Sequence, residues 1–109
     1  MSANEMGKED LQPIADIDRI IHEPARLMIL AFLYVVESAD FLFLERQTGL
    51  TRGNLSRHAG KLEAAGYVAI EKKFVDKIPR TLFHLTDKGR QAFRDYREEI
   101  MQVLGRLPD

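Results

Sequence analysis

The stretch between residues 43 and 65 constrains the fold of this chain most, because two short helical patterns there are separated by only three residues. Gly49 ends the first pattern, as glycine commonly does just past the C-terminus of a helix. Thr51 is a good N-cap for the second pattern, which runs over residues 52–65 and ends at Gly66. Two helices joined by so short a turn are typical of a helix-turn-helix.

The hydrophobic period changes after this pair of helices. Two runs of alternating residues predict two strands, with a tip formed by residues 76–79. Pro79 indicates an edge position near that tip, because proline cannot donate a ladder hydrogen bond. Thr86 caps a last predicted helix over residues 87–107. The two runs are marked by Val68, Ile70, Phe74, Thr81, Phe83 and Leu85.

Upstream of the helix-turn-helix, the apolar spacing predicts two further helices. Residues 1–10 are polar and are expected to be disordered, whereas residues 11–22 carry apolar side chains at helical spacing. Pro24 suits the first turn of a central core helix over residues 24–38, followed over residues 39–41 by a short link or, in the alternative, a minor strand. This helix contains an uncharged run of ten residues, which is too short for a membrane span of about twenty.

Composition adds limits to this organisation. With 109 residues, of which 45% are hydrophobic and 30% charged, the chain has the size of one globular domain, expected over residues 11–109. The absence of cysteine excludes disulfides, thiolate metal sites and cysteine nucleophiles. Residues 1–10 lack the basic and apolar segments of a signal peptide, so a cytoplasmic location is expected.

Several short motifs follow one another in a characteristic order. They are HEPAR at residues 22–26, TGLT at 48–51, NLSRH at 54–58, LEAAGYV at 62–68, RT at 80–81 and LTDKGR at 85–90. Over about residues 14–100 the chain resembles the winged helix-turn-helix regulators of the MarR/ArsR type. The resemblance implies a mainly α, α+β winged-helix fold with N- and C-terminal dimerisation helices. It further implies a homodimeric repressor of transcription that binds a specific double-stranded DNA sequence, with the second helix in the major groove and the hairpin, or wing, on the backbone or minor groove.

The second helix has the two faces that this role needs. At 100° per residue, Leu55, Ala59 and Leu62 fall on one face, which is expected to pack on the core. Arg57 lies on the opposite face, among small residues that allow close approach to a groove. The alternative is an ordinary solvated helix face. The residues around Arg57 are Gly53, Gly60 and Ala64, flanked by Asn54, Ser56 and Lys61.

Side-chain chemistry divides the candidate DNA contacts on this helix. Arginine forms bidentate hydrogen bonds to guanine, and asparagine to adenine, so Arg57 and Asn54 are candidates for base contacts. The candidates for phosphate contacts are Thr51, Ser56 and Lys61, and Arg52 is a further candidate for DNA contact.

Two small residues of this helix depart from the family's pattern. Ala59 stands where relatives usually carry a large aliphatic residue, and Gly60 in mid-helix costs about 1 kcal/mol relative to alanine. Either the helix is less stable than in relatives, or the small residues allow a closer contact.

The hairpin is a second candidate for DNA contact. In a DNA-binding hairpin, basic side chains at the tip neutralise phosphates. The alternative is that they only keep the hairpin soluble and protect the sheet edge. Residues 51–90 hold nine Lys/Arg against four Asp/Glu, although the net charge of the whole chain is -1. A local basic block binds DNA even where the net charge does not favour it. The candidate residues are Lys72, Lys73, Lys77 and Arg80.

The last predicted helix indicates a dimer. Its apolar residues are spaced by three and four, as in the seam of a coiled coil, and such a seam needs a partner that buries it. The partner is a second copy or, in the alternative, residues 11–21 of the same chain. The family resemblance implies that both terminal helices lie at a dimer interface. The seam residues are Phe93, Tyr96, Ile100, Val103 and Leu107.

The remaining polar residues indicate neither a metal site nor a catalytic site. His22, His58 and His84 are scattered along the chain, with His58 toward the core edge of its helix, and are expected to be structural rather than metal ligands. No nucleophile elbow, zinc-binding helix motif or phosphate-binding loop occurs, so we expect neither an enzyme nor a cofactor.

Two alternatives to a simple DNA reader remain open. A winged-helix fold also serves as a protein–protein interaction module without DNA binding. The second alternative is regulation by a small-molecule effector of unknown identity, held in a cleft between the dimer arms. Aromatic residues would line such a cleft, although aromatic residues more commonly belong to the core. The aromatic residues considered for that cleft are Phe32, Tyr34, Phe41 and Phe43.

Overall fold

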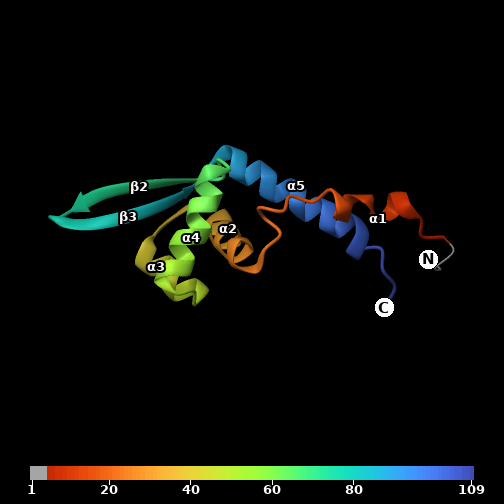
Figure 1. Ribbon diagram of the computed structural model, residues 1–109, viewed down its shortest axis with the longest axis horizontal. Helices are drawn as coiled ribbons and strands as arrows, with labels where there is room; N and C mark the ends of the chain where they lie inside the picture. The colour runs from red at the N-terminus through yellow and green to blue at the C-terminus, as the bar shows by residue number, and fades with distance from the viewer. Residues whose placement is uncertain (1–4) are drawn as a thin grey trace.

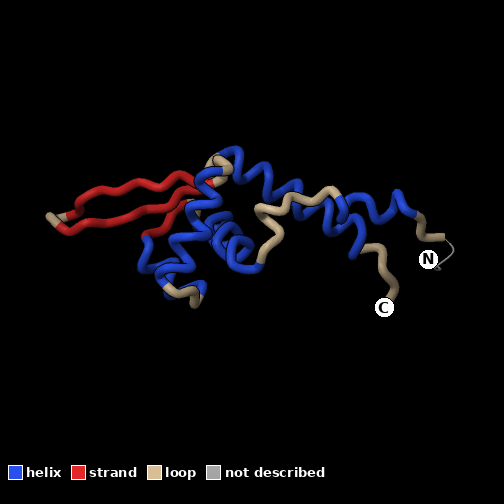
Figure 2. The backbone as a smooth tube through the Cα atoms, viewed as in Figure 1, coloured by secondary structure: helices blue, strands red, loops and turns tan. Residues whose placement is uncertain are grey.

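The computed structural model describes residues 5–109, which fold into five helices and one small sheet (Figure 1). Figure 2 shows a lobe, from which the hairpin extends, and an arm of two helices on the opposite side. The expected mainly helical fold with a β-hairpin is confirmed. The elements are α1 (Lys8–Ala15), α2 (Pro24–Val36), β1 (Ser38–Asp40), α3 (Phe41–Thr48), α4 (Arg52–Ala64), β2 (Val68–Val75), β3 (Ile78–Leu85) and α5 (Asp87–Leu104).

Helix α2 is the centre of the core, as its apolar sequence predicts. Pro24 occupies its first turn, and the Glu23 carboxylate caps the helix by accepting the N–H groups of Ala25 and Arg26 at 3.0 Å each. Three of its side chains, Ile29, Leu30 and Leu33, are fully buried. The core around them includes Leu44, Leu55, Leu62, Val68 and Phe83.

The sheet has the strand order β1-β3-β2, and both pairs are antiparallel. The expected link over residues 39–41 contributes to β1 and to the start of α3. Because β1 pairs only with residues 82–84, the rest of the hairpin extends from the lobe as a two-stranded ribbon (Figure 1). Pro79 therefore lies in β3 with one side open, which suits its missing N–H. The turn is tighter than the predicted tip: Asp76 and Lys77 alone form it, at φ of 52° and 67°, as in a type I′ turn.

Helices α1 and α5 lie side by side and form the arm (Figure 1). The arm makes the molecule long: its Cα radius of gyration is 16.9 Å, against about 13 Å for a compact domain of this length. Helix α5 ends at Leu104, before the predicted end at residue 107. Within residues 5–109, none of the helices combines the length and the hydropathy that a transmembrane segment needs.

The N-terminal helix differs from its prediction at both ends. Helix α1 covers Lys8–Ala15 and not residues 11–22. Residues 8–10 are helical rather than disordered, and residues 1–4 of the expected disordered segment lie outside the described residues.

The segment between α1 and α2 is a turn held by Asp18. Its carboxylate accepts the N–H groups of Ile20 (2.8 Å) and Ile21 (3.3 Å), and this local bonding competes with the helix that the isoleucine spacing predicted. The Tyr67 hydroxyl donates to the other carboxylate oxygen of Asp18. Burial and this hydrogen bond raise the pKa of Tyr67 to about 12. The segment therefore ties the arm to the residue that precedes the hairpin.

Candidate nucleic-acid interface

Caps fix both helices of the helix-turn-helix. The Asp40 carboxylate accepts the N–H of Phe43 (2.8 Å) at the start of α3, and Gly49 ends this helix with a φ of +70°. The Thr51 hydroxyl then accepts the N–H of Asn54 (3.2 Å) at the start of α4. The predicted ends at Gly49 and Thr51 are confirmed.

The two faces of α4 separate as its sequence predicts. Leu55, Ala59 and Leu62 are buried against the core. A Cβ atom at Gly53 or Gly60 would meet no neighbouring atom within 4 Å. Packing among the described residues therefore does not require glycine at these positions, and the small residues keep the outer face flat. The exposed residues of α4 include Arg52, Gly53, Asn54, Ser56, Arg57, Gly60, Lys61 and Ala64.

Arg57 lies on this exposed face but is held by its neighbours. Its Nη2 donates to Asn54 Oδ1 at 3.4 Å and lies 3.2 Å from Nε2 of His58. The structure thus brings together the two residues predicted to contact bases. Within residues 5–109, the donors on Nε and Nη1 of Arg57 have no protein partner, so they are available to a ligand.

His58 is buried and connects α4 to the start of α2. Its Nδ1 lies 3.0 Å from Nη1 of Arg26 and 3.3 Å from Oε2 of Glu23. Burial lowers the pKa of His58 most; Glu23 raises it, and the cations of Arg57, Arg26 and Lys61 lower it. The imidazole is therefore neutral at pH 7. Its position toward the core was predicted, but its contact with Arg57 was missed.

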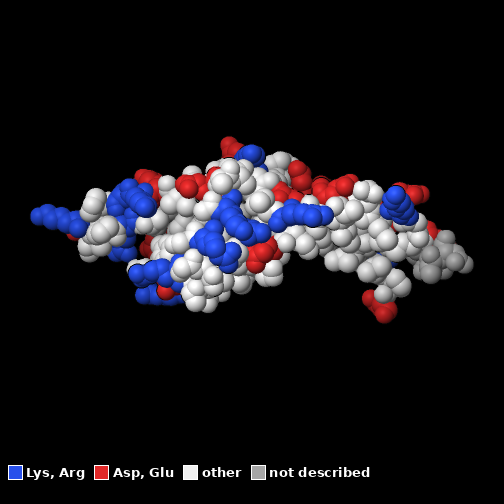
Figure 3. All heavy atoms as spheres, in the orientation of Figure 1, with Lys and Arg blue, Asp and Glu red and all other residues white. Residues whose placement is uncertain are grey.

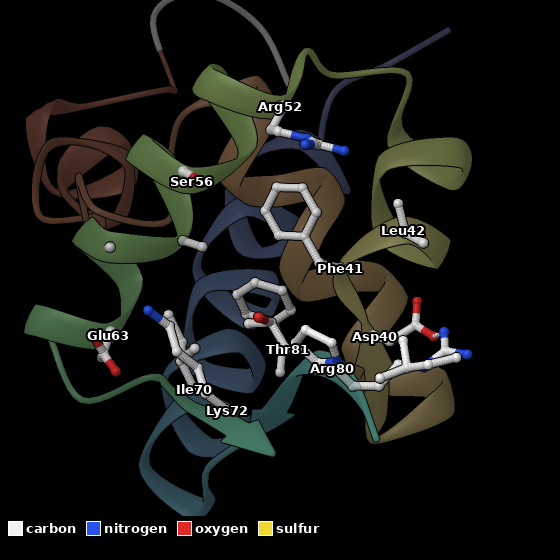
Figure 4. A pocket seen from close by; sticks show the side chains of 15 residues that line it. Asp40, Phe41, Leu42, Arg52, Ser56, Glu63, Ile70, Lys72, Arg80 and Thr81 are labelled. Carbon is white, nitrogen blue, oxygen red and sulfur yellow. Dashed lines mark ion pairs between the residues drawn. The ribbon is translucent and has the colours of Figure 1, made fainter. Parts of the chain in front are cut away.

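A groove of about 790 Å³ separates α4 from the hairpin (Figure 4). Its apolar lining comes from Phe41, Ile70 and Phe83. Figure 4 shows polar side chains from three elements around it: α4, the hairpin, and the junction of β1 with α3. These polar lining residues include Asp40, Arg52, Ser56, Glu63, Lys72, Arg80 and Thr81.

The arginines of the groove are partly neutralised. Arg52 Nε lies 3.9 Å from Glu45 Oε2, and the Arg52 side chain remains 74% exposed. Arg80 Nη1 lies 3.6 Å from Asp40 Oδ2. Both arginines therefore sit at the groove with a weak surface ion pair each, and such pairs contribute little energy against a phosphate ligand.

The lysines of the hairpin are exposed, and within the described residues no ion pair or hydrogen bond holds the ammonium groups of Lys72, Lys73 or Lys77. Figure 3 shows Lys and Arg side chains over the hairpin and over the α3–α4 region, whereas Asp and Glu gather along α5. The predicted basic block is therefore a basic region of the folded surface. The tip also exposes apolar side chains, with Phe74 75% and Ile78 53% exposed.

Known proteins share this combination of features. A family model described as a winged helix DNA-binding domain matches residues 25–104. The chain belongs to this winged-helix family. The uncharacterized protein MJ0432 of Methanocaldococcus jannaschii is 39% identical over 85 residues, which cover 78% of this chain and 92% of that protein. The family consists of DNA-binding domains and not of enzymes.

Solved structures share the winged-helix fold. The transcriptional regulator homologue protein from Pyrococcus horikoshii OT3 has a TM-score of 0.81 at 32% identity, covering 89% of this chain and 95% of that one. Sco3205, a MarR family transcriptional regulator from Streptomyces coelicolor solved in complex with DNA, has a TM-score of 0.52 at 23% identity, covering 91% and 70%. The predicted winged-helix fold and the resemblance to MarR-type regulators are confirmed.

The arm of this winged-helix domain buries part of the predicted α5 seam within the same chain. Tyr96 and Val103 are buried, and the Tyr96 hydroxyl lies 2.8 Å from Nδ1 of His22. Phe93 and Ile100 are half-buried against the core. The alternative of packing within one chain therefore accounts for much of the seam.

Another set of apolar residues on the arm is exposed. Leu107, from the predicted seam, is 48% exposed, and Leu11 of α1 is equally exposed. Met101 and Leu104, which the seam spacing did not include, are 58% and 51% exposed. The arm therefore presents apolar surface that its own chain does not cover.

The four aromatic residues considered for an effector cleft do not form one cluster. Phe41 lines the groove beside α4, whereas Phe32 and Phe43 pair with each other and Tyr34 pairs with a residue of α5. Within residues 5–109, no group of three or more His, Cys, Asp or Glu side chains is placed to hold a metal ion. The ring pairs are Phe32 with Phe43, Tyr34 with Phe93 and Phe41 with Phe83.

Proposed function

We propose that this winged-helix protein is a homodimeric repressor that binds a specific double-stranded DNA sequence, with α4 in the major groove and the wing on the backbone or minor groove. One observation carries the proposal: α4, with exposed Arg52, and the wing, with Lys72 and Arg80, face a common groove (Figure 4). Helix and wing therefore meet one ligand at the same surface.

The outer face of α4 suits contact with base edges. The major groove of B-DNA is about 12 Å wide and admits one helix. Gly53 and Gly60 leave open space on this face, so the helix backbone comes close to the bases. From there Arg57 donates to guanine and Asn54 to adenine, the pairings that these side chains make in the major groove.

The rest of the surface suits the sugar–phosphate backbone. A strand that passes between the major and the minor groove fits the groove between α4 and the wing, where Arg52 and Ser56 face Lys72 and Arg80. Thr51 and Lys61 flank the same helix, and Lys73 and Lys77 extend the basic surface along the wing. These contacts position the protein on DNA without reading its sequence.

Relatives support a regulatory role. The Pyrococcus horikoshii protein carries the name of a transcriptional regulator homologue, and Sco3205 was solved in complex with DNA. These relatives share the fold, and in this chain α4 and the wing carry the cations that such a role requires.

The arm supports a dimer. It projects from the lobe and exposes Leu11, Met101 and Leu104, which a second copy would bury. A two-fold dimer places two copies of α4 on half-sites about one helical turn apart. Bound to such a site, the dimer covers DNA that other proteins need, which is why we infer repression.

Selection from a pool of random duplexes tests the DNA-binding part. The purified protein is mixed with the pool at about 50 mM and about 200 mM salt, and the retained duplexes are sequenced. We expect an enriched, roughly two-fold-symmetric motif, with affinity that falls steeply with salt. Retention of no motif, with weak binding abolished at the higher salt, would contradict the proposal.

Substitution of the exposed arm residues tests the dimer. Met101→Glu with Leu104→Glu is expected to give a monomer by sedimentation and to weaken operator binding by about a hundredfold, because the two half-sites then bind independently. Gln102→Glu is the control, since it adds a charge to α5 without removing apolar surface. A double variant that stays dimeric would move the interface elsewhere.

A protein–protein interaction module is the second candidate, and the wing tip favours it. Phe74, Val75 and Ile78 are exposed there, an arrangement that a protein partner would bury. This candidate would be supported if the protein bound DNA without any enriched motif and if Phe74→Ser abolished binding to a protein partner.

A further inference from the structure

His58 stands between the exposed arginine of α4 and the start of α2. Its Nε2 faces Nη2 of Arg57, and its Nδ1 faces both Nη1 of Arg26 and Oε2 of Glu23. Arginine only donates hydrogen bonds, and a carboxylate only accepts them. A neutral imidazole has one donor and one acceptor, so His58 accepts from only one of its two arginines at a time.

Arg26 does not depend on His58 for its position. Its Nε donates to the carbonyl of Ile20 (2.5 Å), its Nη2 donates to the carbonyl of Arg19 (3.4 Å), and its Nη1 lies 3.7 Å from Glu23 Oε2. The tautomer with its proton on Nδ1 donates to Glu23 and leaves Nε2 to accept from Arg57. In this state Arg26 keeps its other partners, and the contact of 3.0 Å with His58 is not a hydrogen bond.

Arg57 depends on His58 more strongly. Among the described residues, its only other hydrogen-bond partner is Asn54 Oδ1, at 3.4 Å. A protonated His58 has no acceptor left, so its Nε2–H would face Nη2 of Arg57 as a second donor and a like charge. The charged groups that face His58 are Glu23 and Arg26 from the start of α2, and Arg57 and Lys61 from its own helix.

We propose that His58 is a positioning residue for DNA reading: its neutral imidazole holds Arg57 in place for base contact, and protonation releases Arg57. The inference rests on the proposed function and names what controls its central contact. A side chain that is already held loses less conformational entropy when it binds. Because Asn54 and His58 engage only Nη2, the donors on Nε and Nη1 stay available for DNA.

Specific and non-specific binding then respond differently to acid. Protonation adds a positive charge, which strengthens or leaves unchanged the attraction to any phosphate backbone. It also releases Arg57, which weakens binding to the selected operator alone. The ratio of the two affinities is therefore the quantity to measure, and it is expected to fall as the pH drops below 6.5, since the pKa of His58 is lowered from that value.

Two amide substitutions separate the two nitrogens of His58. His58→Asn places its amide near the position of Nδ1, so it keeps partners at Glu23 and Arg26 and loses Arg57. His58→Gln is one methylene longer and places its amide oxygen near Nε2, where it accepts from Arg57 at any pH. At about pH 7.5 we expect His58→Asn to lower the operator-to-nonspecific affinity ratio by about two- to tenfold, the effect of freeing one long side chain, and His58→Gln to rescue most of that loss.

The affinities are measured by fluorescence anisotropy on the selected operator and on a scrambled duplex, at about pH 7.5 and about pH 5.5. The wild-type ratio is expected to fall with pH, and the ratio of His58→Gln to stay level. In an Arg57→Ala background, His58→Asn is expected to have no further effect on the ratio. Thermal unfolding of each variant shows that it is folded.

A second readout does not require DNA. In nitrogen-15 NMR spectra of the wild-type protein, we expect the Arg57 side-chain signals and the His58 ring nitrogens to shift with one common midpoint below pH 6.5. Independent midpoints, a wild-type ratio that does not change with pH, or an effect of His58→Asn that persists without Arg57 would each overturn the inference. A wild-type protein that shows common midpoints but no operator preference would instead overturn the proposed function.

Discussion

Helix α4 and the wing hold their cations in different ways. Helix α4 is fixed by a buried face, and Arg57 on its outer face is bonded to Asn54 and His58. The wing over residues 72–81 is a ribbon that pairs only with itself, and within the described residues no partner holds the ammonium group of Lys77. The difference fits the proposed function, in which α4 contacts bases and the wing contacts phosphates, because base contacts need fixed geometry and phosphate contacts need charge within reach.

Removing the held arginine is the change with the largest expected effect. Arg57→Ala should lower operator affinity by about ten- to a hundredfold and relax the preference at one base position of each half-site, because a bidentate pair with guanine discriminates by that amount. Affinity for scrambled duplexes should change far less. The measurement is the same anisotropy titration, followed by a repeat of the duplex selection.

Arg97→Ala is the matched control, because it removes an exposed arginine from α5, away from the proposed interface. An Arg57→Ala protein with unchanged operator affinity, or one that loses affinity equally for every sequence, would mean that α4 contributes charge only. The contrast between helix and wing would then disappear.

Removing a free lysine of the wing has a smaller and more uniform expected effect. Lys77→Ala should weaken binding to operator and scrambled duplexes by the same factor, about two- to fivefold, and reduce the slope of log affinity against log salt by about one, the change expected for one lost phosphate contact. Titrations at four salt concentrations measure both quantities.

Lys8→Ala on α1 removes the same charge from the arm, and we expect it to leave the slope unchanged. If Lys77→Ala changed the base preference rather than the slope, the wing would read sequence, and the simple division between the two regions would be wrong.

Features governed by near neighbours in the chain were predictable from the sequence. The C-terminus of α3 follows from Gly49 and the N-terminus of α4 from Thr51, because the role of each residue depends only on the adjacent backbone. The buried face of α4 follows from the helical period. The wing strands follow from the alternation of their residues, and their turn differs from the prediction only in length.

Contacts between distant residues were not predictable from such patterns. The link from Arg57 through His58 to Glu23 joins residues from two helices, and it depends on how α2 crosses α4. The Tyr67–Asp18 hydrogen bond likewise joins distant residues, at the turn that replaces the helix predicted from the isoleucine spacing. The sequence offered an indirect signal: a charged pair, Glu23 and Arg26, stands at the start of an apolar core helix.

The smallest expected effect is on the free energy of unfolding. It distinguishes the buried His58 of α4 from the half-buried His84 of the wing. Because burial lowers the pKa of His58 below 6.5, the unfolded chain takes up this proton at a higher pH than the folded protein does. The stability that His58 contributes is therefore complete above pH 6.5 and is lost as the pH falls toward its folded pKa, by at most about 1.4 kcal/mol per pH unit for one proton. The pKa of Glu23 is lowered from 4.5, since hydrogen bonds from Ala25 and Arg26 outweigh the effect of burial, so its own contribution is lost only at lower pH.

Urea unfolding at several pH values between about 7 and about 5 isolates the histidine contribution. Wild-type protein and His84→Gln are expected to lose the same free energy of unfolding over this range, because both retain the buried His58. His58→Gln should lose less, since it has no group to protonate there. An equal loss in His58→Gln would place the acid-sensitive group elsewhere and leave α4 no more sensitive to pH than the wing. A loss confined to proteins that retain His58 would show that acid destabilises the fold through α4 and not through the wing.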